Sequence, residues 1–188
     1  MVITDIVLIN LDRDVERLEQ SKRELEKFDI SFERIPGVYN PIPWKGFNKA
    51  YMNALRAIPS GGIIFEDDIE LDSFYIPDLP KGWDMLYFGC NLQEPTDRIN
   101  DELVRVFGAW TTHAILYSAQ CVKNILREFD PEEVVYDEWL RREFCRRNNC
   151  YMTTPMQAYQ RDGYSNLMKT QANYRAGFDS NYNKFTGR

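Results

Sequence analysis

Gly61-Gly62-Ile63-Ile64-Phe65-Glu66-Asp67-Asp68 is the stretch that decides the fold of this 188-residue chain. Two glycines open a continuous apolar run, and such a run is typical of a strand that is buried on both faces of an α/β sheet. The run ends abruptly in three acids. Because ligands of α/β proteins bind beyond the carboxyl ends of the strands, we expect Glu66, Asp67 and Asp68 to lie at a ligand-binding edge.

The three adjacent carboxylates also point to a bound cation. Like charges repel one another unless a cation neutralises them, and a set of oxygen ligands favours a hard ion such as Mn²⁺ or Mg²⁺. With a bound diphosphate, such an ion would bridge phosphate oxygens and stabilise the charge of a leaving group. The alternative is a solvated acidic turn that opens a loop, which is the commoner explanation when such a stretch is considered alone.

The composition is that of a folded globular protein, for which we expect one domain over residues 1–188. Hydrophobic residues make up 44% of the chain and aromatic residues 14%, which is enough for a sizeable core. A net charge of −6 argues against a general nucleic-acid-binding protein, because phosphate contacts need a basic surface. The four cysteines match no common zinc pattern, so we expect reduced, mostly buried thiols.

We expect neither a targeting segment nor a membrane span. Asp5 and Asn10 interrupt the apolar run from Met1 to Leu11, and no basic region precedes it. This run is predicted to be the first strand. No later apolar stretch approaches the length needed to cross a bilayer, so the sequence predicts a soluble, cytoplasmic protein.

Strands and helices are predicted to alternate, which favours an α/β fold with a mostly parallel central sheet and helices on both faces. Helices are predicted after Asp12 or Asp14, over Phe47 to Ile58, and after Ser118. Besides the acid-tipped run, strands are predicted at Met1 to Leu11, Phe32 to Ile35, Met85 to Phe88, Val104 to Trp110 and Ala114 to Tyr117. Residues 162–188 show no clear period and are predicted to form an irregular covering segment.

Several motifs resemble, in order, landmarks of glycosyltransferase family 25, a family of lipooligosaccharide and collagen galactosyltransferases. These motifs are Ile9-Asn10-Leu11-Asp12-Arg13 followed by Arg17, Phe32-Glu33-Arg34-Ile35, Phe65-Glu66-Asp67-Asp68, Trp83-Asp84, Thr112-His113-Ala114, Asp137 with Leu140, and Tyr164-Ser165-Asn166. They span the chain almost end to end. The resemblance implies a single-domain, Rossmann-like GT-A fold, a UDP-sugar donor, a divalent metal, and inversion at the anomeric carbon.

The chain departs from the family pattern at one place. Where family members usually carry Ser-His after a Gly-Cys pair, this chain has Gly46-Phe47 and then Ala50-Tyr51. The contacts that the family makes there with donor or acceptor are therefore in doubt.

The segment from Asn10 to Arg17 is the predicted donor-binding segment. It would leave the first strand at the same sheet edge as the acids, so that backbone groups and Arg13 or Arg17 could meet the nucleotide. A guanidinium suits phosphate because its planar fork binds two oxygens together. The two arginines could instead be solvated on a helix. The resemblance favours donor binding by Asn10, Leu11, Arg13 and Arg17.

The resemblance makes Asp68 the principal metal ligand, and Glu66 and Asp67 would reach the metal or the ribose of the donor. His113, the only histidine, is the second candidate ligand. Its imidazole could complete a manganese shell or hydrogen-bond an acceptor hydroxyl. A lone histidine is more often structural, and that alternative stays open.

Inverting transfer needs a carboxylate that removes a proton from the attacking hydroxyl. Asp137 is the candidate, because it follows Val134-Val135-Tyr136 and precedes a predicted helix whose amino terminus would lie near the sheet edge. Aspartate is also a favoured helix cap, so a capping role is the alternative. Glu138 would replace Asp137 as the base if Asp137 only caps.

For two further sets of residues we favour a structural role over a functional one. The basic cluster of Arg141, Arg142, Arg146 and Arg147 is expected to be solvated surface, with binding of phosphate or of an acidic acceptor as the alternative. The aromatic residues Trp44, Trp83, Trp110, Trp139, Tyr159 and Tyr164 are expected mainly in the core, although one or two could stack on a sugar.

The sequence therefore predicts an inverting, metal-dependent transferase that moves galactose or glucose from a UDP-sugar to a hydroxyl of a glycan or glycoconjugate. A rival is a catalytically silent nucleotide-sugar-binding or glycan-binding protein, which the altered Ala50-Tyr51 position and the short chain suggest. A sugar transferase acting on nucleic acid is a weaker rival, because the net charge is acidic. Peripheral association with a membrane that carries the acceptor stays open.

Overall fold

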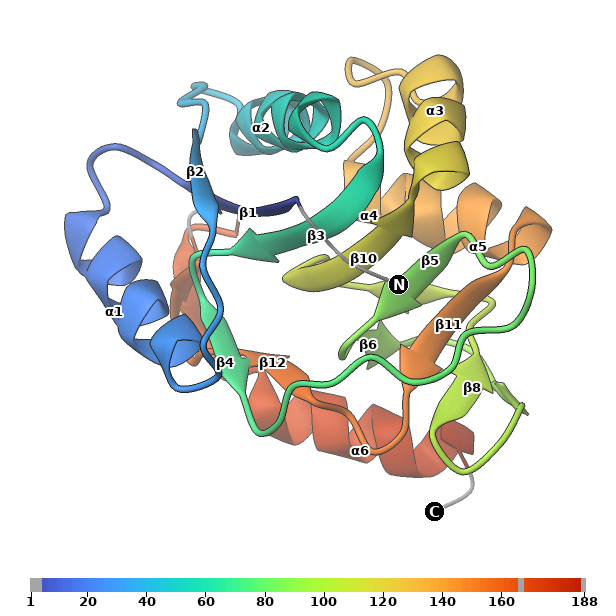
Figure 1. Cartoon of the computed structure of the whole chain (residues 1–188). Helices are drawn as coiled ribbons and strands as arrows, with labels where there is room; N and C mark the ends of the chain where they lie inside the picture. The colour runs from blue at the N-terminus through green and yellow to red at the C-terminus, as the bar shows by residue number, and fades with distance from the viewer. Residues whose placement is uncertain (1–4, 166–167, 187–188) are drawn as a thin grey trace.

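The computed structural model describes residues 5–165 and 168–186, and its centre is a mixed sheet of eight strands in the order β2-β1-β3-β10-β5-β11-β8-β7 (Figure 1). The strands are β1 (Ile6–Asn10), β2 (Glu33–Pro36), β3 (Gly61–Glu66), β5 (Met85–Tyr87), β7 (Asp97–Arg98), β8 (Leu103–Arg105), β10 (Ala114–Ser118) and β11 (Cys150–Thr153). The acid-tipped strand β3 lies between β1 and β10, in the interior of the sheet.

Among the described residues, three two-stranded sheets accompany the central one: β4 (Ile69–Leu71) with β12 (Ala158–Gln160), β6 (Asn91–Leu92) with β9 (Ala109–Trp110), and β13 (Gly163–Ser165) with β14 (Thr170–Ala172). The helices are α1 (Val15–Glu26), α2 (Pro43–Ala57), α3 (Ala119–Glu128), α4 (Tyr136–Trp139), α5 (Cys145–Arg147) and α6 (Arg175–Thr186), with a π-helical segment (Leu140–Phe144) joining α4 to α5.

The α/β class is confirmed, but the prediction of a mostly parallel sheet was wrong. β1 runs parallel to β2 and β3, and β11 runs parallel to β5, whereas β10 is antiparallel to both β3 and β5. A parallel neighbour needs a long crossover, usually a helix. Residues 88–113 provide short strands and loops instead, so the chain enters β10 from the end at which β3 leaves the sheet.

Helices lie on both sides of the sheet, as predicted. α2 and α3 cover the upper face in Figure 1, and α1 lies against the lower face. Alternate residues of one strand belong to different clusters: Ile64 packs on the α2 and α3 side, while Ile63 and Phe65 pack on the α1 side. This alternation, with both faces covered, explains why β3 reads as an uninterrupted apolar run.

Local sequence explains where two of the helices begin. The Ser118 hydroxyl accepts a hydrogen bond of 3.0 Å from the backbone N–H of Cys121, which confirms the predicted cap of α3. α2 begins at Pro43, four residues before the predicted start, because proline is favoured in the first turn of a helix.

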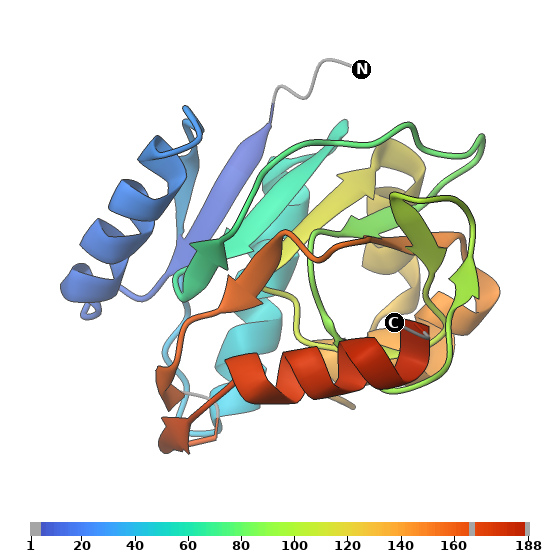
Figure 2. The same cartoon turned by 90° about the horizontal axis from the view of Figure 1, so that it is seen from below.

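The prediction for residues 162–188 was wrong over most of the described part of that segment. A hairpin, β13–β14, is followed by the twelve-residue helix α6, which crosses the lower side of the molecule in Figure 2. Phe178 of α6 is fully buried, and its ring lies 5.4 Å from that of His113 and 5.9 Å from that of Tyr159. Asn166, from the family-like motif, lies outside the described residues.

Two further predictions differ from the structure in detail. The predicted strand from Val104 to Trp110 is divided between β8 in the central sheet and β9 in a separate pair. Within the described residues the first strand begins at Ile6, and residues 1–4 are not described. All four cysteines are free and buried, as predicted. No helix in the described part of the chain is both long and apolar enough to cross a membrane.

Replacing Phe178 by alanine should lower the free energy of unfolding by about 3 kcal/mol, because the change leaves a cavity between α6 and the body of the domain. Urea unfolding followed by circular dichroism measures this. Ser180→Ala on the exposed side of the same helix is the control and should change stability by less than about 0.5 kcal/mol. Equal, small effects of both changes would contradict the docking of α6.

Candidate functional site

A cavity of about 770 Å³ opens at the ends of β1 and β3. The predicted site residues that line it are Asn10, Leu11, Arg13, Arg17, Glu66, Asp67, Asp68 and Asp137. The remaining wall comes from the loop after β2, from α2, from Trp110 to Thr112, and from the C-terminal hairpin. Residues spread over most of the chain thus meet in one place, and His113 is the predicted site residue that is not part of its lining.

The pairing of the strands brings these residues together. β1 and β3 run parallel with Ile9 opposite Glu66, so the residues that follow them, Asn10 and Asp67, leave the sheet side by side. The Glu66 N–H donates a hydrogen bond of 2.9 Å to the His113 carbonyl, which places the start of β10 at the same edge. The prediction that the acids and the Asn10 segment share a sheet edge is confirmed.

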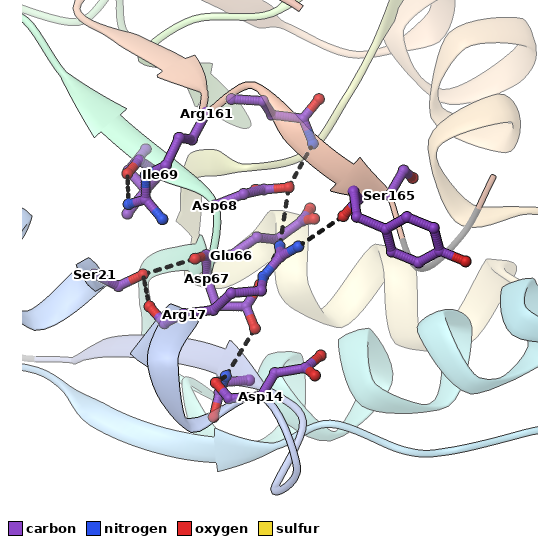
Figure 3. Close-up of polar contacts among 12 residues, drawn as sticks. Asp14, Arg17, Ser21, Glu66, Asp67, Asp68, Ile69, Arg161 and Ser165 are labelled. Carbon is purple, nitrogen blue, oxygen red and sulfur yellow. Dashed lines mark hydrogen bonds and ion pairs between the residues drawn. The ribbon is translucent and has the colours of Figure 1, made fainter. Parts of the chain in front are cut away.

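Asp67 has a full set of partners. Asn10 Nδ2 donates to one carboxylate oxygen at 2.7 Å, and Arg17 Nε donates to the other at 2.8 Å. The backbone carbonyl of Asp67 accepts a hydrogen bond of 2.8 Å from the Ser21 hydroxyl, so α1 is fixed to the end of β3 (Figure 3). Burial raises the pKa of Asp67, and the charge of Arg17 opposes that rise.

The guanidinium group of Arg17 makes its contacts inside the site. Besides Asp67, its guanidinium forms an ion pair of 3.2 Å with Asp68 Oδ2 and donates to the Tyr164 carbonyl at 3.2 Å (Figure 3). Burial alone would lower the pKa of Arg17, but the charges of Asp68 and Asp67 raise it above its ordinary value. Arg17 therefore ties the acidic cluster to the hairpin, a role that sequence reasoning did not foresee.

Glu66 and Asp68 are less well compensated than Asp67. Burial, followed by the charge of Asp68, raises the pKa of Glu66 to about 8, and the Thr112 hydroxyl donates to its Oε1 at 2.6 Å. Burial also raises the pKa of Asp68, against the effect of Arg17. Asp68 Oδ1 is buried and has no hydrogen-bond partner among the described residues. When both are ionised, Glu66 and Asp68 carry more negative charge than the neighbouring side chains neutralise, which is why burial raises their pKa values.

Oxygen donors that fit a hard cation are present, although not as a ready-made cluster. In the portion of the chain that the structure describes, no group of three His, Cys, Asp or Glu side chains is arranged to hold a metal. Asp67 explains this, because both of its oxygens are held by Asn10 and Arg17. The carboxylates that remain for a cation are those of Glu66 and Asp68, and the unpartnered Asp68 Oδ1 fits such a ligand.

His113 lies away from the cavity. It is fully buried, packs edge-on against Phe178, and neither ring nitrogen has a hydrogen-bond partner of normal geometry in the described part of the chain. Burial lowers its pKa to about 4, which the nearby Ala158 carbonyl partly opposes. Its predicted role as a metal ligand or acceptor contact is not supported by this position, and the structural alternative describes it better. A buried packing position at the start of β10 could not be distinguished from a ligand by spacing alone.

Asp137 lies at the amino terminus of α4, as predicted, but inside the first turn and not before the helix, and it lines the cavity. The helix cap is Val135, so the N-cap position is not that of Asp137. Burial raises the pKa of Asp137, while hydrogen bonds from the backbone N–H groups of Glu138 and Thr111 lower it. Glu66 is near enough for the charge of Asp137 to raise its pKa further. The two buried carboxylates thus share one cavity.

Asn48 of α2, which sequence reasoning missed, fixes the turn that carries Asp137. Its Nδ2 donates to the carbonyls of Pro131 at 2.9 Å and Val134 at 2.8 Å, and its Oδ1 accepts from the Tyr136 N–H at 2.9 Å. Asn48 is fully buried, so these bonds are protected from water. The sequence signal that could have identified Asn48 is the presence of an asparagine on the apolar face of a predicted helix.

Glu138 and the arginine cluster form a separate, ion-paired surface. Glu138 accepts hydrogen bonds from Arg141 at 2.7 and 2.8 Å and from Trp110 Nε1 at 2.8 Å, and these partners lower its pKa to about 2. Glu138 also pairs with Arg142, while Arg146 pairs with Glu94 and Arg147 with Glu143. The substitute base is therefore held outside the cavity lining, and the cluster has the solvated, surface character that we favoured.

The residues at which the chain departs from the family pattern lie partly in the wall of the cavity and partly in the core. Gly46, Phe47 and Ala50 line the cavity, whereas Tyr51 is fully buried and its hydroxyl donates to the Thr112 carbonyl at 2.8 Å. A Cβ at Gly46 would lie 2.2 Å from the Val38 carbonyl oxygen, so this position requires glycine. The departure changes the wall of the cavity near α2 and leaves the acidic side intact.

The structure also adds residues that no motif indicated. Tyr39, Trp110 and Gln160 line the cavity together with Lys169 and Tyr174 of the C-terminal segment. Their positions depend on loops and short strand pairs, for which the sequence gives no periodic signal. Comparison of the chain with models of protein families and with curated proteins finds no match.

His113→Leu tests the buried position of the imidazole. In the folded protein His113 stays neutral down to about pH 4, whereas in the unfolded chain it binds a proton near pH 6.5. Acidification between these values therefore favours the unfolded wild-type chain, and the leucine variant lacks this loss. When the pH is lowered from 7 to 5, the free energy of unfolding of the wild-type chain should therefore fall by about 2 kcal/mol relative to that of the variant.

Urea unfolding of both proteins at the two pH values measures this shift. Groups other than His113 titrate in both proteins, so their contributions cancel in the difference. A difference that does not depend on pH would show that the imidazole reaches solvent in the folded protein.

Proposed function

We propose that the cavity binds a UDP-sugar and that the chain is an inverting, metal-dependent hexosyltransferase with a GT-A fold. In this proposal galactose or glucose passes to a hydroxyl of a glycan or glycoconjugate. The observation that carries it is the meeting, in one cavity of about 770 Å³, of the acidic end of β3 with the separate buried carboxylate of Asp137. Sugar transfer needs both a site for the diphosphate with its cation and a base for the acceptor.

The size and lining of the cavity suit a nucleotide sugar. Small-molecule sites usually enclose roughly 300–1,000 Å³ and combine apolar walls with a few placed polar groups. The lining includes Leu11, Val38, Tyr39 and Pro41, which offer apolar surface to the nucleobase. The acids lie on another part of the lining, where the sugar diphosphate would be held.

Arg13 is the arginine that we assign to the diphosphate. It lies in the loop between β1 and α1, lines the cavity, and its guanidinium lies 5.3 Å from the centre of the Tyr39 ring. It pairs with Asp14 at 3.7 Å, and its side chain is 57% exposed, so a ligand can reach it. Arg17 is committed to Asp67, Asp68 and the hairpin, and its role is to hold the acids in place.

Glu66 and Asp68 are the carboxylates that would hold a divalent cation, and a bound cation would stabilise the charge on the departing UDP. The buried Asp68 Oδ1 and the raised pKa of Glu66 support this, because each marks a carboxylate that the chain itself does not neutralise. Asp67 supports the site through Asn10 and Arg17.

Asp137 would act as the base. Its carboxylate accepts the proton of the acceptor hydroxyl while the oxygen of that hydroxyl bonds to the anomeric carbon, and the bond from that carbon to the phosphate oxygen breaks. Burial raises the pKa of Asp137, which makes it a better proton acceptor than an exposed aspartate. The N–H groups of Thr111 and Glu138 hold the carboxylate in one orientation.

Donor binding is tested by isothermal titration calorimetry of UDP-galactose and UDP-glucose with and without Mn²⁺. We expect saturable binding of at least one donor, tighter with Mn²⁺. In a thermal shift assay, a donor at one hundred times its Kd should stabilise the folded chain by about 2.7 kcal/mol. UDP-sugars that leave both measurements unchanged would refute the proposal.

Asp137→Asn tests the chemistry. The amide fills the same space and keeps one acceptor oxygen for the backbone N–H groups, but it cannot take a proton. We expect UDP release in the presence of glycan acceptors to fall by about a hundredfold or more, with donor affinity nearly unchanged.

Glu138→Gln is the matched control, because Glu138 lies next in sequence but is held by Arg141 outside the cavity lining. It should retain most of the turnover. Donor binding by the wild-type chain without any UDP release would instead identify the silent nucleotide-sugar-binding protein.

A further inference from the structure

Gln160 lies beside Asp68 because two short strands pair. β12 ends at Gln160, which is opposite Ile69 of β4, the residue that follows Asp68. The Arg161 N–H also donates to the Asp68 carbonyl at 2.6 Å. The backbone of both residues is therefore fixed, and Gln160 lines the same cavity as the acids.

The two side chains leave an unusual pair of unsatisfied oxygens. Gln160 is only 8% exposed, and its Nε2 lies at a long 3.4 Å from Asp68 Oδ2. Gln160 Oε1 and Asp68 Oδ1 are both buried, and neither has a hydrogen-bond partner among residues 5–165 and 168–186. Leaving a buried acceptor unpaired costs about 1–3 kcal/mol. A ligand that bonds to both oxygens would recover that energy.

A neighbouring glutamine shows that this arrangement is specific to the cavity. Gln157 is fully buried, yet its Oε1 accepts from the Tyr75 N–H at 2.7 Å and its Nε2 donates to the Tyr75 carbonyl at 3.0 Å. Asp67 likewise has partners on both oxygens. The unpaired oxygens therefore belong to Gln160 and Asp68, two residues that line the cavity, whereas the neighbouring Gln157 and Asp67 are satisfied.

The charges around the two oxygens favour a cation as the missing partner. Three carboxylates, those of Glu66, Asp67 and Asp68, lie at the end of β3, and the guanidinium groups that face them belong to Arg17 and Arg161. Arg161 donates from one terminal nitrogen to Gln20 Oε1 at 2.6 Å and from the other to the Ile69 carbonyl at 2.9 Å, so both of these nitrogens already have partners. Amide and carboxylate oxygens are ligands of hard divalent ions.

We propose that Gln160 Oε1 and Asp68 Oδ1 are two protein ligands of a divalent cation, so that Gln160 takes the role predicted for His113. This inference rests on the cation of the proposed function and names a residue for it. The amide must turn so that its oxygen faces the ion, which the long contact of 3.4 Å to Asp68 allows.

The test is a titration of the full chain with Mn²⁺ alone, in which electron paramagnetic resonance measures the free ion. Gln160→Met keeps the size of the side chain and removes the amide oxygen. We expect its affinity for Mn²⁺ to fall by about tenfold or more, at least the effect of removing an outer partner of a metal site. His113→Leu and the exposed-site control Gln171→Met should bind Mn²⁺ like the wild-type chain.

Urea unfolding without metal shows that Gln160→Met is folded, and its stability should match or exceed that of the wild-type chain because an unpaired buried oxygen is removed. Mn²⁺ affinity of Gln160→Met within about threefold of wild type overturns the Gln160 inference and leaves the proposed function standing. Weakened binding by His113→Leu also overturns it.

A wild-type chain that shows no saturable Mn²⁺ binding, with or without UDP, overturns both the inference and the metal dependence of the proposed function. Donor binding in the presence of EDTA then separates the two parts of that function, because the assignment of Arg13 and of the apolar wall to the nucleotide does not depend on the ion.

Discussion

The buried carboxylate of Asp67 is the interaction on which the site depends. Its two oxygens bind Asn10 at the end of β1 and Arg17 on α1, so one side chain joins two strands and a helix at the sheet edge. The Ser21 hydroxyl adds a hydrogen bond to the Asp67 carbonyl. A buried charge is tolerated only when it is paired and hydrogen-bonded, and here the pairing also fixes the walls of a cavity.

Satisfying Asp67 leaves its neighbours under-compensated. Arg17 gives two contacts to Asp67 and a longer one to Asp68, so Glu66 and Asp68 share what remains. Their raised pKa values follow from burial with incomplete neutralisation. Three consecutive acids thus perform two tasks. Asp67 holds the architecture, while Glu66 and Asp68 are carboxyl groups whose ionised forms need a further positive charge for full neutralisation. Carboxyl groups whose pKa values are raised by burial and by neighbouring charges are typical of functional sites.

Local rules predicted the parts of the site that depend on one strand end. Asn10 and Asp68 follow apolar runs, so their place at a common edge could be read from the sequence. The direction of β10 could not, because it depends on how residues 88–113 return to the sheet. That direction brings His113 to the acidic edge, but its side chain packs in the core, which spacing alone could not reveal. The position of Gln160 beside Asp68 depends on the pairing of β4 with β12, which lie about ninety residues apart in the sequence. No periodic pattern in the sequence indicates that pairing.

Helix α6 did leave a trace that was overlooked. Phe178, Tyr182 and Phe185 are spaced four and three residues apart, as on one helical face, within a segment whose Asn and Gly content suggested a loop.

The position of Asp137 helps to distinguish the proposed transferase from a catalytically silent binding protein. Within the described residues it forms no ion pair, and its partners are backbone N–H groups. Burying a carboxylate without a cation opposes folding, yet Asn48 places three buried hydrogen bonds on the turn that holds it there. The proposed transferase gives this arrangement a use, because a base for an incoming hydroxyl works best when it is fixed and not neutralised by a cation.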